Sequence, residues 1–310
     1  MKIGIPNNAF SNNKILITEL KKVSSDLKIN ESKRRLQGEE LISFLKGCEA
    51  AIIGMEEINN EIIEQLPSLK FISKFGVGMN NINLEDLKKN NVNFDVTKGV
   101  NKRAVSELTL GLILNLIRNI SRSSIETKAS AWNKNGGEGL SSLTLGIIGF
   151  GYIGKDLVKL ISPFGTRILI NDIRKVSLPK NSKNIKVVEK DYLYRNSDII
   201  SIHTPLTKLT YNMININVFK KMKKGSFIIN TARGGIINES DLLVAIKRDI
   251  ILGAALDVYQ NEPPLITDLI KDKRVITTPH IGGNSKEAIL KMGMAAINQI
   301  INYKKANYEI

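Results

Sequence analysis

The sequence predicts an α/β protein built from two doubly wound domains, each with a parallel sheet. Three observations support this fold class. Short apolar runs alternate with longer amphipathic segments along most of the 310 residues, and the apolar runs end at turn residues. In the second half of the chain these runs are almost continuously hydrophobic, as strands covered by helices on both faces require.

The first domain is expected within residues 1–100, where four short apolar runs predict its strands. They are KIGIP at 2–6, AAIIGM at 50–55, KFISKFG at 70–76 and NVNFDV at 91–96. A long helix is then expected to begin at about Ala104 and to run past Leu116.

The second domain is expected to cover residues 101–283, where six stronger runs predict strands. They are TLGIIGF at 144–150, RILIND at 167–172, DIISIHT at 198–204, SFIINTA at 226–232, GAALDV at 253–258 and RVITTPH at 274–280. A last helix, from about Lys286 within residues 284–310, is expected to complete the first domain.

Composition and charge restrict the class of protein. The chain is 42% hydrophobic and 24% charged, contains one cysteine, and has no apolar run long enough to span a bilayer, so we expect a cytoplasmic protein without a signal peptide or a membrane partner. The net charge of +15 would suit a nucleic-acid binder, but only KKMKKG at 220–225 is dense in lysine, and no nucleic-acid-binding motif is present. We therefore expect no nucleic-acid partner, while a positive field would also attract a small anionic substrate.

The segment TLGIIGFGYIGKDL places Gly149, Gly151 and Gly154 between a predicted strand and a predicted helix, with Tyr152 and Ile153 inside the motif. In that context G-x-G-x-x-G predicts a dinucleotide-binding loop of the Rossmann type, whereas the glycines alone would also suit an ordinary turn. The next predicted strand ends at Asp172, roughly 20 residues further on, where a carboxylate can bind the ribose hydroxyls of NAD. Asp172 favours NAD over NADP, although Arg174 and Lys175 weaken that preference.

Four successive predicted strands of the second domain end in polar residues, which suggests one shared cleft at the carboxyl edge of the sheet. The polar residues are His203 and Thr204, which Pro205 follows, then Arg233, then Asp257 with Glu262 beyond it, and finally His280.

Three of these side chains together suit hydride transfer between a nicotinamide and a 2-hydroxy or 2-keto acid. His280 can donate or accept a proton, Arg233 can bind the substrate carboxylate through two parallel hydrogen bonds, and Glu262 can orient the histidine. Taken singly, each has a simpler explanation: a surface arginine, a solvated acid, a packed core ring. A metal site is not predicted, because no second histidine or cysteine lies at ligand spacing. His203 could line the nicotinamide pocket or only cap a strand.

The sequence resembles the D-isomer-specific 2-hydroxyacid dehydrogenases, especially the phosphoglycerate dehydrogenase branch, from about residue 40 to about residue 300. The motifs that carry the resemblance are SKFGVGMNNINL, ELTLGLIL, LGIIGFGYIG, ISIHTPLT, INTARGGIINE, AALDVYQNEPP and TTPHIGG. The resemblance implies a Rossmann NAD-binding domain, a flavodoxin-like substrate domain, a homodimer built through the helix near residues 104–120, and catalysis in the cleft between the domains.

The resemblance also implies roles for individual residues. Arg233, Glu262 and His280 would be catalytic. The expected NAD-binding residues are Gly149, Gly151, Tyr152, Ile153, Gly154, Asp172, His203, Thr204, Pro205, Thr231, Ala232, Arg233, Asp257 and His280. Of these, Asp257 and the backbone of Thr231–Arg233 would hold the nicotinamide carboxamide. The expected substrate-binding residues are Lys74, Gly76, Val77, Gly78, Asn101 and Arg233.

This chain departs from the family pattern in the substrate loop and at its end. Asn80 and Asn83 stand where relatives often have aspartate, and Lys74 stands where phosphoglycerate dehydrogenases commonly have arginine. The chain ends at Ile310, so we expect no regulatory domain after it. Hydroxypyruvate, glyoxylate, 3-phosphohydroxypyruvate and bulkier keto acids all stay open as substrates. The alternative function is a catalytically silent NAD(H)-sensing regulator with the same fold.

Overall fold

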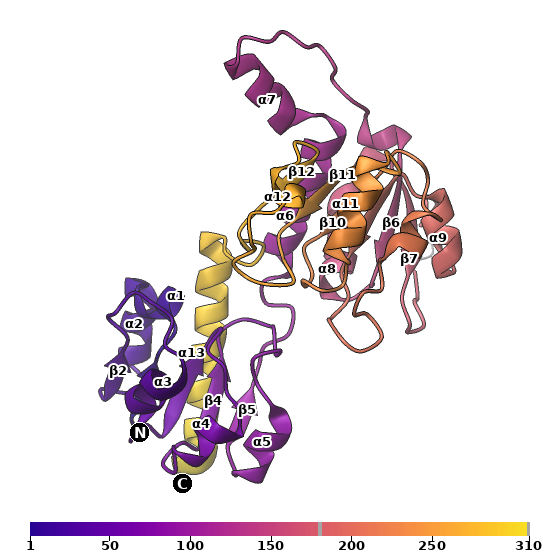
Figure 1. The fold of residues 1–310 in the computed structure, drawn as a ribbon. Coiled ribbons are helices and arrows are strands. Elements are labelled where there is room, and N and C mark those ends of the chain that lie inside the picture. Colours follow the sequence, from indigo (N-terminus) through magenta and orange to yellow (C-terminus); the bar gives the residue numbers. More distant parts are fainter. Residues whose placement is uncertain (179–181, 309–310) are drawn as a thin grey trace. The chain divides into compact units, whose positions relative to one another are not determined.

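The computed structural model describes residues 1–178 and 182–308, and the chain divides into two compact units (Figure 1). One unit comprises Met1–Asn101 together with Gly283–Ile310, and the other comprises Lys102–Gly282. They are called unit 1 and unit 2 below, and each is described by itself.

Unit 1 contains a five-stranded parallel sheet with the order β2-β1-β3-β4-β5. Numbered from its own first strand, this is the order of flavodoxin-like sheets. Its strands are β1 (Ile3–Ile5), β2 (Leu27–Ile29), β3 (Ala50–Ile53), β4 (Phe71–Lys74) and β5 (Asn93–Asp95). Its helices are α1 (Asn8–Ser11), α2 (Lys14–Lys21), α3 (Gly38–Leu45), α4 (Asn60–Glu64), α5 (Leu84–Lys89) and α13 (Lys286–Tyr308).

Helix α13 lies against the sheet of unit 1 although it is the last element in the sequence (Figure 1). Its buried side chains share one apolar cluster with residues of β1, β3 and β4. A polar contact fixes the register, because the hydroxyl of Ser73 donates to Gln299 Oε1 at 2.7 Å in the buried interior. The C-terminal helix therefore completes the core of the unit that the N-terminal residues begin.

Unit 2 contains a seven-stranded parallel sheet with the order β12-β11-β10-β9-β6-β7-β8. This is the Rossmann order with one additional strand, and the order reverses between β6 and β9, where such folds bind their ligands. Its strands are β6 (Thr144–Ile148), β7 (Arg167–Asn171), β8 (Ile185–Val187), β9 (Ile199–Ile202), β10 (Ser226–Asn230), β11 (Ile251–Leu256) and β12 (Val275–Thr277). Its α-helices are α6 (Lys102–Ile117), α7 (Ile120–Lys128), α8 (Tyr152–Ile161), α9 (Lys190–Asn196), α10 (Ile216–Phe219), α11 (Glu239–Lys247) and α12 (Asp268–Lys271), and short 3₁₀ turns lie at Leu140–Ser142 and Ser162–Phe164.

Separate apolar clusters cover the two faces of this sheet. Helices α6 and α8 contribute Leu112, Ile113 and Leu157 to one cluster. Helices α10 and α11 contribute Phe219 and Leu242 to the other. Because both faces are covered, the central strands are apolar at almost every position, and the predicted class of two parallel-sheet α/β domains is confirmed.

Two strands, β2 and β8, were not among the predicted runs. Each has three residues with a lysine in the middle, Lys28 and Lys186, and each pairs with a neighbour on one side only. Short edge strands that carry charge discourage pairing with other chains, and for the same reason they give a weak apolar signal.

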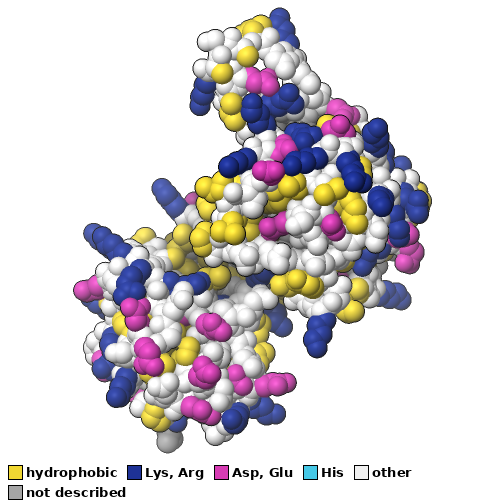
Figure 2. Space-filling view, viewed as in Figure 1, with side chains coloured by type: hydrophobic (Ala, Val, Ile, Leu, Met, Phe, Trp, Pro, Cys, Tyr) yellow, Lys and Arg dark blue, Asp and Glu magenta, His cyan; other side chains and the backbone are white. Residues whose placement is uncertain are grey.

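Lysine and arginine side chains are spread over the visible face of the molecule, with acidic side chains among them (Figure 2). Within the dense cluster at 220–225, Lys221 pairs with Asp191 at 3.0 Å and Lys223 pairs with Asp198. Part of that cluster is therefore neutralised locally. In the described part of the chain, no helix combines the length and the apolar character needed to cross a membrane.

Candidate active site

The glycine loop joins β6 to α8 and leaves no room for side chains at two of its glycines. Gly149 has φ +96°, a left-handed conformation that favours glycine, and a Cβ there would lie 2.6 Å from the carbonyl oxygen of His203. A Cβ at Gly154 would lie 2.3 Å from the carbonyl oxygen of Gly149. At Gly151 the nearest atom of the described residues would be 3.9 Å away, so they leave the space beside this glycine open. Gly151 also precedes α8 without a side-chain cap, so the first N–H groups of the helix can face an anion.

Asp172 follows β7 and is tied to the glycine loop. Its Oδ2 accepts a hydrogen bond from the backbone N–H of Phe150 at 2.7 Å. Its Oδ1 accepts from the backbone N–H of Arg174 at 2.8 Å, and the Arg174 guanidinium donates to both oxygens at 3.1 Å. The hydrogen bonds of Arg174 lower the pKa of Asp172 to about 2 although burial opposes this. The carboxylate is therefore charged, and ribose hydroxyls would have to replace the contacts of the mostly exposed Arg174 side chain.

The end of β9 presents two buried polar atoms that lack a hydrogen-bond partner among the described residues. They are Nδ1 of His203 and Oγ1 of Thr204. The other ring nitrogen of His203, Nε2, lies 2.8 Å from the hydroxyl of Ser201, and burial lowers the pKa of His203 to about 3. His203 is thus a neutral ring beside Gly149. Buried polar atoms that the described part of the chain leaves without a partner, next to an open glycine loop, fit the binding of a polar cofactor.

Arg233 lies in the turn after β10, and Asn230 fixes that turn from both sides. The side chain of Asn230 accepts from the N–H of Ala232 at 3.0 Å and donates to the carbonyl of Arg233 at 2.8 Å. Thr231 is held to α6 by a 2.8 Å contact between its hydroxyl and that of Thr109. Burial lowers the pKa of Arg233, and the charge of Glu262 opposes this shift. The Arg233 guanidinium donates to the carbonyl of Ala232 at 2.6 Å.

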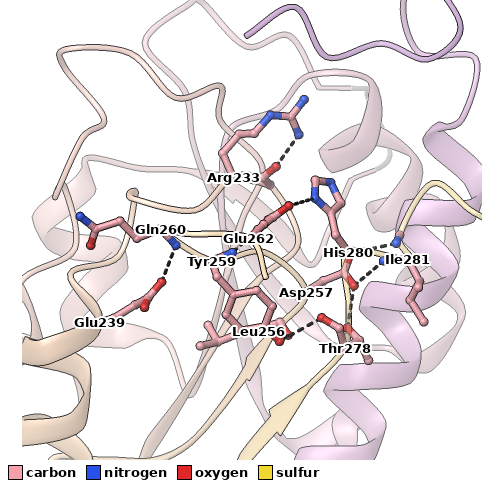
Figure 3. Close-up of polar contacts among 12 residues, drawn as sticks. Arg233, Glu239, Leu256, Asp257, Tyr259, Gln260, Glu262, Thr278, His280 and Ile281 are labelled. Carbon is pink, nitrogen blue, oxygen red and sulfur yellow. Dashed lines mark hydrogen bonds and ion pairs between the residues drawn. The ribbon is translucent and has the colours of Figure 1, made fainter. Parts of the chain in front are cut away.

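Glu262 and His280 form the closest pair of candidate catalytic side chains (Figure 3), with 2.7 Å between Glu262 Oε2 and His280 Nδ1. Glu262 Oε1 accepts from the backbone N–H of Tyr259 at 3.1 Å. Burial would raise the pKa of Glu262, but the hydrogen bond and charge of His280, with smaller contributions from Tyr259 and Arg233, hold it below its usual value. A charged carboxylate at Nδ1 fixes the orientation of the ring and leaves Nε2 as the nitrogen that faces away from Glu262.

Asp257 is buried at the end of β11 and accepts three hydrogen bonds from the segment around His280. Its Oδ1 accepts from the hydroxyl of Thr278 at 2.6 Å and from the N–H of Ile281 at 2.8 Å. Its Oδ2 accepts from the N–H of Gly282 at 2.8 Å. The structure therefore brings Arg233, Asp257, Glu262 and His280 to one edge of the sheet of unit 2 (Figure 3).

The residues predicted to bind substrate, apart from Arg233, belong to unit 1. Lys74 ends β4 and is 2% exposed; its ammonium donates to the carbonyl of Gly54 and, at 2.9 Å, to Asn81 Oδ1. Residues 76–78 follow β4 and are half-buried. Asn101 is half-buried at the end of the first segment, and a Cβ at Gly283 would lie 2.8 Å from its Nδ2.

Sequence reasoning missed Tyr259 and Thr278, which contact the segments that carry the candidate catalytic side chains. Tyr259 lies in the motif AALDVYQNEPP between Asp257 and Glu262, both of which were predicted site residues. Its position in that motif could therefore have identified it as a residue near the site. Within residues 1–178 and 182–308, no group of three His, Cys, Asp or Glu side chains is arranged to hold a metal ion.

Residues 110–282 match the family model described as "D-isomer specific 2-hydroxyacid dehydrogenase, NAD binding domain". The chain belongs to the D-isomer-specific 2-hydroxyacid dehydrogenase family. The match covers the glycine loop, Asp172 and the four residues at the sheet edge. As a member of this family, the chain is an NAD-dependent oxidoreductase that interconverts D-2-hydroxy acids and 2-keto acids.

Individual relatives agree with the family. The chain is 35% identical over 273 residues to a hydroxypyruvate reductase of Thermotoga maritima, covering 86% of this chain and 88% of that protein. It is 34% identical over 253 residues to a D-3-phosphoglycerate dehydrogenase of Bacillus subtilis, covering 80% of this chain and 48% of that protein. A crystal structure from Polaromonas sp. JS6 66, described as a D-isomer-specific 2-hydroxyacid dehydrogenase, has a TM-score of 0.91 at 26% identity, and the match covers 98% of this chain and 97% of that one.

Proposed function

We propose that Arg233, Glu262 and His280 carry the 2-hydroxyacid dehydrogenase reaction in this chain. The observation that supports this most strongly is the 2.7 Å contact between Glu262 Oε2 and His280 Nδ1. A carboxylate at that distance orients the ring and stabilises its protonated form, which is what a proton donor to a keto acid requires.

Each of the three side chains has a separate role in the proposed reaction. When bound, NADH would supply the hydride for the keto carbon. The imidazolium of His280 donates its proton to the keto oxygen, and Glu262 stabilises the charged ring before the transfer. Arg233 binds the substrate carboxylate and polarises the carbonyl, since a guanidinium can donate two parallel hydrogen bonds. In the reverse direction the neutral ring of His280 accepts the proton of the hydroxyl.

NAD would be held by the edge of the sheet in unit 2. The open space at Gly151 and the first N–H groups of α8 suit the pyrophosphate, and the anionic Asp172 suits the ribose hydroxyls. His203 Nδ1 and Thr204 Oγ1, which have no partner within residues 1–178 and 182–308, would bind polar groups of the cofactor. The backbone of Thr231–Arg233 and the remaining hydrogen-bonding capacity of Asp257 would hold the nicotinamide carboxamide.

The substrate we favour is a small 2-keto acid such as hydroxypyruvate or glyoxylate, and unit 1 would be the substrate domain. The buried ammonium of Lys74 is engaged with Gly54 and Asn81, which makes it a poor centre for a phosphate group. A phosphorylated substrate therefore ranks second. We also propose a homodimer formed through α6, as the family resemblance implies, and a cytoplasmic location, which a single buried free cysteine suits.

The pH dependence of NADH oxidation tests this proposal, once a panel of keto acids has found a substrate. For reduction, kcat/KM should be high at low pH and fall as pH rises, because His280 loses the proton that it must donate. For oxidation of the hydroxy acid the slope should be opposite. Glu262→Gln keeps the shape but removes the charge that favours the imidazolium, so the falling limb for reduction should move to lower pH.

Two results would contradict the proposed roles. One is a falling limb that survives in His280→Gln. The other is a limb that stays in place in Glu262→Gln, which would mean that the carboxylate does not act on the ring.

A further inference from the structure

We infer that Asp257 and Tyr259, at the end of β11, are positioning residues that hold the turn of His280 in its working conformation. The inference rests on the proposed role of His280 and adds two residues that act through it. Both reach the turn by way of Thr278, and Asp257 also binds the backbone beyond His280 (Figure 3).

The turn needs such support because its backbone is unusual. His280 has φ +53°, in the left-handed region that L side chains rarely adopt. Its N–H donates to the carbonyl of Thr278 at 3.0 Å, which closes a tight local turn. A residue in this conformation persists only when its surroundings over-determine it. The direction of the imidazole therefore depends on what holds residues 278–282.

Asp257 holds the turn on both sides of His280. The carboxylate accepts from the Thr278 hydroxyl before the histidine and from two backbone N–H groups, those of Ile281 and Gly282, after it. The residue is 1% exposed, so these hydrogen bonds form away from water. A Cβ at Gly282 would lie 2.9 Å from Oδ2 of Asp257, so the absence of a side chain there permits the close approach.

Tyr259 connects the turn with the segments of the other two catalytic candidates. Its hydroxyl lies 3.0 Å from the carbonyl of Leu256 and 2.9 Å from the carbonyl of Thr278, so its one proton is shared between β11 and the turn. Its backbone N–H holds Glu262, and its carbonyl would lie 1.7 Å from a Cβ at Gly234, directly after Arg233. Burial raises the pKa of Tyr259 to about 12, so the hydroxyl keeps its proton through the working range.

The segment between Tyr259 and Glu262 has a second attachment. Glu239, at the start of α11, accepts from the backbone N–H of Gln260 at 2.7 Å. The loop that carries Glu262 is thus fixed to a helix independently of the His280 turn. A hydroxyl deletion at Tyr259 should therefore loosen the turn and leave the loop in place.

Tyr259→Phe is the sharpest test because it removes one hydroxyl and nothing else. We expect kcat for keto-acid reduction to fall by roughly 3- to 10-fold, the effect of one net hydrogen bond, while KM and the Kd for NADH change less than about twofold. Tyr194→Phe is the matched control: Tyr194 is also buried in unit 2, but its hydroxyl has no partner among the described residues. That variant should keep the wild-type kcat.

A structural readout separates a change at His280 from a general loss of stability. The chain has only two histidines, so the ring signals in an NMR spectrum of histidine-labelled enzyme can be assigned with His203→Gln. In Tyr259→Phe the His280 signal should shift or broaden while the His203 signal stays in place. In Tyr194→Phe the His280 signal should not change.

Thr278 allows the contact of Asp257 with the turn to be tested without replacing the buried carboxylate itself. Thr278→Val removes the hydroxyl that Asp257 accepts from and should lower kcat in the same way as Tyr259→Phe. Thr278→Ser restores the donor and should recover most of the loss.

Combined variants decide whether these residues act through His280. If they do, Tyr259→Phe added to His280→Gln should cost almost no further kcat, because the imidazole that the hydroxyl positions is already gone. The inference would be overturned if Tyr259→Phe lowered kcat in the His280→Gln background as much as it does in the wild type. It would also be overturned if Tyr259→Phe alone kept the wild-type kcat and the wild-type His280 signal. If His280→Gln itself retains the rate, the proposed function fails instead; the two failures are therefore distinguishable.

Discussion

The two histidines of this chain both lie at the carboxyl ends of strands in one sheet, yet their surroundings are opposite. His280, after β12, is about one-third exposed and has a carboxylate on its Nδ1. His203, after β9, is 9% exposed, faces the hydroxyl of Ser201, and has its pKa lowered to about 3 by burial. A histidine at a strand end is therefore not by itself a proton carrier. The neighbours decide whether the ring can change charge.

The comparison is sharpest when both histidines are replaced by the same residue. His280→Gln should lower kcat for keto-acid reduction by roughly 100- to 10,000-fold, the usual contribution of a positioned general acid. His203→Gln should leave most of kcat and should weaken NADH binding, because His203 carries a buried Nδ1 without a described partner. Steady-state rates and NADH fluorescence titration measure the two effects. Equal losses of kcat in both variants would break the comparison.

Arg233 belongs with His280 in this comparison, because it is a charged side chain held at the same edge of the sheet. Arg233→Ala should cost on the order of 100- to 1,000-fold in kcat, since one substitution removes both the carboxylate clamp and the carbonyl polariser. Arg233→Lys should recover only part of the rate, since an ammonium cannot donate two parallel bonds in one plane. An alanine variant within threefold of wild type at saturating substrate would remove Arg233 from the proposed site.

Asp172, at the end of β7, is another strand-end side chain whose neighbours determine its charge, and its proposed contact is with the adenosine ribose of NAD. Wild type should prefer NADH to NADPH, because a 2′-phosphate would meet this anionic carboxylate. Asp172→Ala should reduce the ratio of kcat/KM with NADH to kcat/KM with NADPH by roughly 10- to 100-fold, mainly through weaker NADH binding. Arg174→Ala should instead tighten NADH binding, because the Arg174 guanidinium occupies both carboxylate oxygens. Equal or higher kcat/KM with NADPH in the wild type would show that Arg174 or Lys175 governs the choice.

The smallest effect concerns stability in acid. The pKa of His203 falls from 6.5 to about 3 on folding, so between these values the unfolded chain binds a proton that the folded chain does not. The contribution to stability is complete above pH 6.5 and is lost as pH falls towards 3. His203→Gln should therefore make the decline of the unfolding free energy between pH 6.5 and pH 4 shallower, by on the order of 1–3 kcal/mol. Denaturant titrations at several pH values measure the change of the unfolding free energy with pH. Tyr194→Phe is the control and should keep the wild-type pH dependence. A wild-type pH dependence in His203→Gln would show that the His203 ring is not buried in its neutral form.

Much of the fold was accessible from local sequence patterns. Apolar runs such as TLGIIGF and SFIINTA predicted the central strands because both of their faces are buried, which leaves no alternation of polar residues. The glycine loop was equally local, since the tight turn at Gly149 and the close packing at Gly154 are properties of the backbone over a few residues. The edge strands β2 and β8 escaped prediction because three residues with a central lysine carry almost no apolar periodicity.

Local sequence patterns predicted which residues belong to the candidate site but not the surroundings of their side chains. Strand-end positions, the chemistry that hydride transfer requires and the family resemblance together selected Arg233, Glu262 and His280, and their catalytic roles stay predictions that the variants above test. What the sequence could not determine is the environment of each side chain. Residues that are distant in the sequence determine several of these environments: the neutral state of His203, the hydrogen bond from Phe150 to Asp172, the burial of Lys74, and the hydrogen bonds of Asp257 and Tyr259 to the His280 turn. Hydrogen-bond partners and desolvation are set by atoms within a few ångströms in space, so only the tertiary structure decides them.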